Sequence, residues 1–90
     1  MTFYSITYWR LMVELILSEA QLACLKAAVT VGSYESAALG RAKGLGTVFN
    51  PEPVVVKCTR AIAERLFTVA RRSCPDVAPQ IRAAIEQAKQ

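Results

Sequence analysis

The segment that most constrains the fold covers residues 29–39, Val-Thr-Val-Gly-Ser-Tyr-Glu-Ser-Ala-Ala-Leu. Gly32 follows an apolar-periodic stretch and can adopt the positive φ that ends a helix. The Ser33 hydroxyl can then accept a hydrogen bond from a free amide of the next helix. Tyr34 lies in the first turn of that helix, and Ala37 is small enough to let two helices approach closely. The segment therefore predicts a tight turn between two antiparallel helices.

The chain has 90 residues, which is enough for one domain spanning residues 1–90. Apolar residues make up 53% of the sequence and the mean hydropathy is +0.28. Because so small a domain buries only part of its apolar surface in its own core, we expect some of this surface to contact a partner. The net charge of +4 permits an acidic partner, although cations spread along helices more commonly form a solvated face.

The cysteines bear on the compartment. Cys24, Cys58 and Cys74 are three in number and include no Cys-x-x-Cys pair, which argues against a disulfide framework and against a structural zinc site. Reduced thiols in the cytoplasm are the prediction. Charged residues interrupt the apolar stretch between residues 3 and 31. That stretch is therefore predicted to be neither a signal peptide nor a membrane span.

Apolar periodicity predicts helices along the whole chain. Residues 3–17 carry two apolar stripes at helical spacing, and a short strand within residues 3–8 is the alternative. Ser18 and Gln21 fit a capping box, which either starts a second helix or lies inside one long helix over residues 3–31. We favour the single helix, with at most a slight kink at Ser18. The helix that begins at Tyr34 is expected to end near Lys43, where glycines follow.

The second half is predicted to hold two more helices. Asn50 and Pro51 form a typical helix start for a helix that ends near Ser73. The β-branched residues 54–56 would also suit a strand, but the proline-led start favours a helix. Asp76 is expected to begin the last helix. The predicted fold is all-α, with four or five antiparallel helices in hairpins, as in a small helical bundle.

Nothing in the sequence indicates catalysis. The chain contains no histidine, which removes Ser-His and Cys-His dyads and histidine metal ligands. The seven Asp and Glu residues are scattered and form no evident acid and base pair. We therefore expect no catalytic residues, no metal ligands and no cofactor, and a protein that is not an enzyme.

The predicted turn resembles the junction of the two helices in a tetratricopeptide repeat, through Gly32, Tyr34 and Ala37 in a Gly-x-Tyr-x-x-Ala pattern. It is also similar to the small tetratricopeptide-like chaperones of type III secretion needle subunits, which follow this turn with a Glu-Pro-led helix and a Pro-initiated terminal helix. Glu52-Pro53 and Pro75 are the comparable positions here. The resemblance implies a tetratricopeptide-like fold and a cytoplasmic chaperone. Such a chaperone holds an amphipathic helix of its partner, usually together with a small helical co-chaperone.

A binding module needs apolar side chains that reach its partner, and aromatic residues and methionine dominate such contacts. The candidate partner-binding residues, each of which is equally compatible with a plain core position, are Tyr4, Tyr8, Trp9, Met12 and Tyr34. Two other functions stay open. The first helix can pair with a second copy in a homodimeric regulatory or phage protein. A nucleic-acid-binding role is disfavoured because no recognition pattern accompanies the cations it would use, Arg60, Arg65, Arg71, Arg72 and Arg82.

Overall fold

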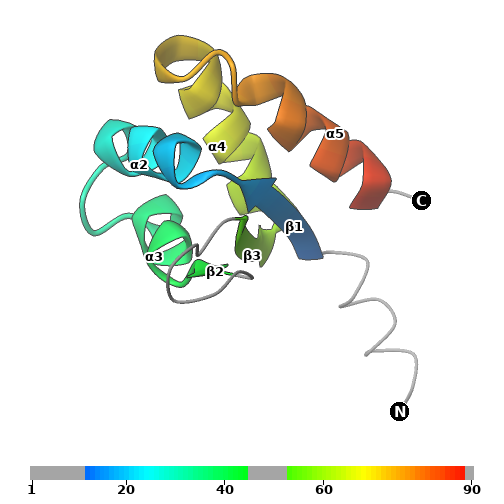
Figure 1. Ribbon diagram of the computed structural model, residues 1–90, viewed down its shortest axis with the longest axis horizontal. Helices are drawn as coiled ribbons and strands as arrows, with labels where there is room; N and C mark the ends of the chain where they lie inside the picture. Colours follow the sequence, from blue (N-terminus) through cyan, green and yellow to red (C-terminus); the bar gives the residue numbers. More distant parts are fainter. Residues whose placement is uncertain (1–11, 45–52, 89–90) are drawn as a thin grey trace.

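The computed structural model describes residues 12–44 and 53–88. Within them, a three-stranded antiparallel sheet packs against four helices (Figure 1). The elements follow in the order β1 (Met12–Leu17), α2 (Glu19–Ala28), α3 (Tyr34–Gly40), β2 (Lys43–Gly44), β3 (Val54–Thr59), α4 (Arg60–Ser73) and α5 (Ala78–Ala88). The fold is therefore mixed α/β. The prediction of an all-α fold, as a helical bundle or a tetratricopeptide-like array, is wrong.

The first correction concerns residues 12–17, which form strand β1 instead of the end of a helix. Val13, Leu15 and Leu17 are buried, whereas Glu14 and Ile16 are exposed. This alternation has the period of two that is typical of a strand with one covered face. In an apolar segment this short, helical and strand periodicities coincide, so the pattern alone did not distinguish them.

The second correction concerns the segment after Pro53. Residues 54–59 form strand β3, and the helix α4 starts only at Arg60. The Thr59 side chain caps α4 by accepting a hydrogen bond from the Ile62 amide at 3.3 Å. The alternative of a strand at residues 54–56 is thus the correct one, and the predicted helix end at Ser73 is confirmed. Asn50 and Pro51 lie outside the described residues.

Strand β3 is the centre of the sheet, in the order β1-β3-β2. β1 and β3 are antiparallel in a register that sets Val13 opposite Cys58 and Leu15 opposite Val56. These four side chains are buried and belong to the core together with Leu25, Leu39, Leu66 and Ile81 from the four helices. One face of the sheet thus packs against the helices, as the layers of a two-layer domain do.

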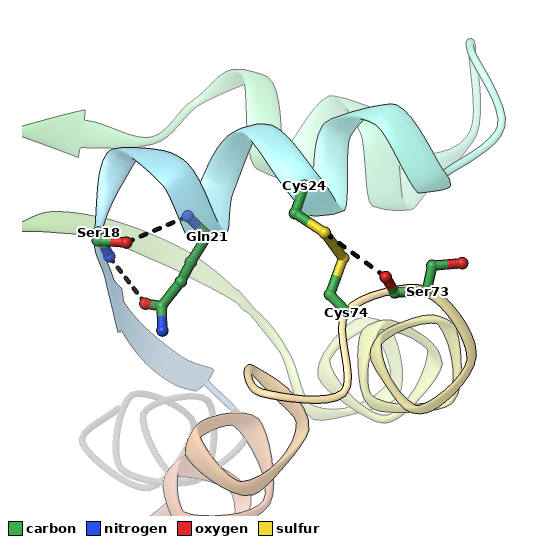
Figure 2. The surroundings of a disulfide bond; sticks show 5 residues. All are labelled: Ser18, Gln21, Cys24, Ser73 and Cys74. Carbon is green, nitrogen blue, oxygen red and sulfur yellow. Dashed lines mark hydrogen bonds between the residues drawn. A yellow bond between two sulfur atoms is a disulfide. The ribbon is translucent and has the colours of Figure 1, made fainter.

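The region around Ser18 is not one long helix. Its side chain accepts a hydrogen bond from the Gln21 amide at 3.1 Å, and its own amide donates to Gln21 Oε1 at 2.9 Å (Figure 2). This is the predicted capping box, and it starts α2 directly after β1 ends. A helix running through Ser18 would have no need of this cap.

The turn between α2 and α3 follows the prediction at two positions. Gly32 has φ of +85°, which favours glycine because it lacks a Cβ atom. The Ser33 hydroxyl accepts a hydrogen bond from the Ser36 amide at 3.1 Å and caps α3. Ala37, expected at a close approach between helices, is instead exposed, and the neighbouring Ala38 is fully buried. The small residue that the packing needs is therefore one position later.

A disulfide bond joins Cys24 on α2 to Cys74 at the end of α4 (Figure 2). The two residues are 50 positions apart and their Cα atoms are 6.3 Å apart, which is within the range that a disulfide spans. The prediction that all cysteines are reduced thiols is wrong for this pair. Sequence spacing did not show it because only the packing of α2 against α4 brings the two residues together.

Candidate functional site

The second face of the sheet is less covered than the first and carries the candidate site. Its side chains come from alternate positions of β1 and β3, where Glu14 lies opposite Lys57 and Ile16 opposite Val55. Ile16 is 56% exposed, although it is a large apolar side chain within a strand pair. Glu14 and Lys57 form an exposed ion pair, with 3.9 Å between Oε1 and Nζ.

A cavity of about 440 Å³ opens where this face meets the ends of α3 and α4. The cavity exists at this point because β2 is short and leaves the side of β3 partly uncovered. Five elements or their caps contribute residues to its lining. Its lining combines apolar and basic side chains: Met12, Arg41, Lys43, Val55, Lys57, Cys58, Thr59 and Ile62. A cavity of this size and mixed character is typical of a binding site.

The charge of the cavity is positive. Arg41, Lys43 and Lys57 line it, and no carboxylate is among the described lining residues. Lys57 has the weak pair with Glu14. Within residues 12–44 and 53–88, no ion pair involves Arg41 or Lys43. Cations that line a concave surface without internal partners attract an anionic group.

One backbone group at the free edge of β1 is bonded by a side chain from α5, which a side chain from α2 holds in turn. Gln80 on α5 donates from Nε2 to the Ile16 carbonyl oxygen at 3.2 Å. Gln21 on α2 in turn donates to Gln80 Oε1 and accepts from the Ser18 amide. A side chain bonded to the edge of a strand blocks the addition of another strand there. The opposite edge of the sheet lies beside the cavity.

That opposite edge is only partly occupied. β2 pairs with β3 at two positions, Lys43 with Val55 and Gly44 with Val54. The chain before Lys43 turns away from β3, since the Arg41 and Ala42 amides donate to carbonyl groups of α3, those of Ala38 and Leu39, at 3.2 Å each. Among the described residues, no strand lies opposite Lys57 on this side.

Cys58 is the remaining free cysteine of the described residues, and it lines the cavity wall while being itself buried. Burial disfavours the thiolate and raises the pKa of the Cys58 thiol to about 11. At neutral pH the side chain is thus a neutral thiol, which is a poor nucleophile and a poor metal ligand. No cluster of metal-ligating side chains occurs in the described parts of the chain.

The predicted partner-binding residues do not form one site. Met12 is half-buried at the start of β1 and lines the cavity. Tyr34 is 75% exposed at the first position of α3 and does not line it. Tyr4, Tyr8 and Trp9 lie outside the described residues. Reasoning from helical stripes missed the three cavity cations because they belong to three different elements.

A second basic surface lies at the junction of α4 and α5. The guanidinium carbons of Arg71 and Arg82 lie 5.8 and 5.5 Å from the centre of the Phe67 ring, within the range of cation–π contacts. Arg82 also pairs with Glu86 at 3.5 Å, and Arg65 pairs with Glu35 at 3.2 Å. Three of the five arginines considered for nucleic-acid binding therefore have intramolecular contacts.

Comparisons with known proteins found no match to the chain among family models, curated proteins or solved structures. The resemblance to needle-subunit chaperones is therefore untested. In the described part of the chain, no helix has the length and apolar character needed to cross a membrane.

Proposed function

We propose that this chain is a non-catalytic binding domain that holds an acidic segment of another protein in the cavity beside β3. The observation that carries this proposal is the cavity lining, in which Arg41, Lys43 and Lys57 meet no carboxylate among the described lining residues, and of these three cations only Lys57 has a described ion pair, the exposed one with Glu14. An acidic segment supplies the missing charges.

The apolar part of the lining supports a protein segment as the ligand. Met12, Val55 and Ile62 are half-buried and can take up apolar side chains that alternate with the acidic ones. A partner segment that covers this area would remove apolar surface from water as well as pair charges.

The absence of histidine from the sequence and the raised pKa of the Cys58 thiol support a non-catalytic role. The sequence provides no imidazole to act as a general base near neutral pH, and the Cys58 thiol is protonated at that pH. The original expectation of a binding module is thus kept as a proposal, while the helical groove on which it relied is replaced by the basic cavity.

The test is a binding titration with a fluorescently labelled peptide, acetyl-Glu-Val-Glu-Val-Glu-Val-amide. The same peptide with Gln in place of Glu is the neutral control. The acidic peptide is expected to bind and the neutral peptide to bind at least about tenfold more weakly, since several charge contacts of a few tenths of a kcal/mol add up to about 1.4 kcal/mol. Equal affinities, or no binding of either peptide, would contradict the proposal.

A protein-side control isolates the cavity from the overall charge. The double variant Arg41→Glu, Lys43→Glu is expected to lose at least about tenfold in affinity. Lys26→Glu, Arg72→Glu changes the net charge equally at exposed positions that do not line the cavity. If the second variant weakens binding as much as the first, the attraction is a property of net charge and the cavity is not the site. Circular dichroism melts establish that both variants are folded.

A further inference from the structure

The hydrogen-bond pattern of the sheet shows which backbone groups of β3 face the cavity side. Ile16 is paired with Val55 across β1 and β3, yet the Ile16 carbonyl accepts from Gln80, outside the sheet. Backbone groups of one residue in an antiparallel ladder point to the same side, and that side alternates along the strand. Ile16 and Val55 are thus a pair without mutual hydrogen bonds, and the Val55 backbone groups point toward β2.

Two residues further along β3, the same alternation directs the Lys57 amide and carbonyl to the β2 side of the strand, as for Val55. Opposite Val55 stands Lys43 of β2, but β2 does not reach Lys57 because the chain enters the last turn of α3 at that level. Within the described residues, the backbone groups of Lys57 therefore meet no partner strand. An unpaired backbone edge of this kind is a template for another strand.

We propose that the acidic segment binds in extended form, as a short strand added to β3 alongside Lys57 and Thr59, in line with β2. This mode rests on the proposed function, because it concerns the same cavity and the same ligand. The added stretch is short: α4 begins at Arg60, so about three residues, or roughly 10 Å, can pair.

The side chains around this edge fit an extended acidic ligand. Three cations lie along the path of the added strand. Lys43 is on β2, next to the unpaired stretch of β3, Lys57 is on β3 itself, and Arg41 is at the end of α3. Alternate side chains of an extended segment point to opposite faces. A segment with acidic residues at every second position can then meet these cations, while its intervening residues contact Ile62 and Met12.

Hydrogen exchange of single amides, measured by NMR, tests this mode on the intact chain. In the free protein the Cys58 amide, which points toward β1, is expected to exchange slowly and the Lys57 amide quickly. With the alternating Glu-Val peptide at about 100 times its Kd, roughly one protein molecule in a hundred has an unoccupied site. If only the unoccupied form exchanges, exchange of the Lys57 amide is expected to slow by roughly a hundredfold. Exchange at exposed residues of α5 serves as the internal control.

Backbone methylation of the peptide gives an independent readout. An N-methyl group is expected to abolish binding at positions that face Lys57 and to leave it unchanged at the positions between them, which gives a period of two. If the peptide binds but exchange at Lys57 is unaltered and the effect of N-methylation shows no period of two, the added strand is wrong. The proposed binding of an acidic segment in the cavity would then still hold. The absence of binding overturns the proposed function as well. A dimer of the free chain with Lys57 protected would assign the edge to a second copy instead.

Discussion

Gln80 on α5 donates a hydrogen bond from Nε2 to the backbone carbonyl oxygen of Ile16 on β1, at 3.2 Å. This contact connects residues that are 64 positions apart and satisfies a polar group on the outer edge of the sheet. It also occupies one outward-facing backbone group of the β1 edge, whereas beside β2 the described residues place no partner strand opposite Lys57.

Gln80→Leu tests the closure of the β1 edge. The variant loses the bond to Ile16 and is expected to lose about 0.5–1.5 kcal/mol of stability, since the carbonyl remains accessible to water. It is also expected to self-associate through the exposed edge, which light scattering after size exclusion would detect. Gln87→Leu, at another exposed position of α5, is the control. Equal behaviour of the two variants would show that Gln80 has no protective role.

The register of β1 can be tested by two adjacent substitutions. Leu15 is 1% exposed and Ile16 is 56% exposed. Leu15→Ala is expected to cost about 2–5 kcal/mol, whereas Ile16→Ala is expected to cost less than about 1 kcal/mol. Urea denaturation followed by circular dichroism gives both values. Two similar losses would argue against a strand with one covered face.

The disulfide between Cys24 and Cys74 closes a loop of 50 residues. Its reduction is expected to lower the free energy of unfolding by about 2–4 kcal/mol, because the unfolded chain regains the entropy that the crosslink removes. The measurement is the urea midpoint with and without a reducing agent, with alkylation and intact mass to count free thiols.

Two variants make the disulfide prediction specific. Cys24→Ala should melt at the same urea concentration with and without the reducing agent, since it has no disulfide to lose. Cys58→Val should keep the full difference. A wild-type midpoint that does not respond to reduction would mean that the bond contributes nothing to stability. The Cys24 sulfur lies 3.7 Å from the Ser73 carbonyl oxygen, a contact that becomes an S–H···O hydrogen bond once the cysteine is reduced.

Cys58 predicts a specific pH dependence. Its folded-state pKa of about 11 lies above the ordinary value of 9.0, because burial disfavours the thiolate. The neutral thiol therefore contributes its stabilisation fully below pH 9, and this contribution is lost as the pH rises toward 11. Stability measured by urea denaturation between pH 8 and 11 should decline less in Cys58→Val than in the wild type.

At pH 8 the native protein should also resist thiol reagents, and denaturant should expose one reactive thiol. Rapid modification of the native protein would contradict the burial of this group.

Local signals in the sequence located several boundaries correctly. Ser33 after Gly32 starts the helix α3 where predicted, because caps depend on residues three positions apart. The capping box of Ser18 and Gln21 was also recognised, but the single long helix that we favoured there is wrong, since α2 starts after the strand β1. The end of α4 at Ser73 was predicted from the proline that follows. Within the site, only Met12 was named in advance, and for a helical groove that the fold does not have.

The order of helix caps and turns was thus determined by the sequence itself, since each depends on neighbours that the chain places side by side. The tertiary structure decided the rest. Met12–Leu17 and Val54–Thr59 are strands because each supplies the hydrogen-bond partners of the other across about 40 residues of chain. The disulfide and the basic cavity exist for the same reason. Their residues are far apart in the sequence, and only the packing of four helices on one sheet face brings them within contact distance.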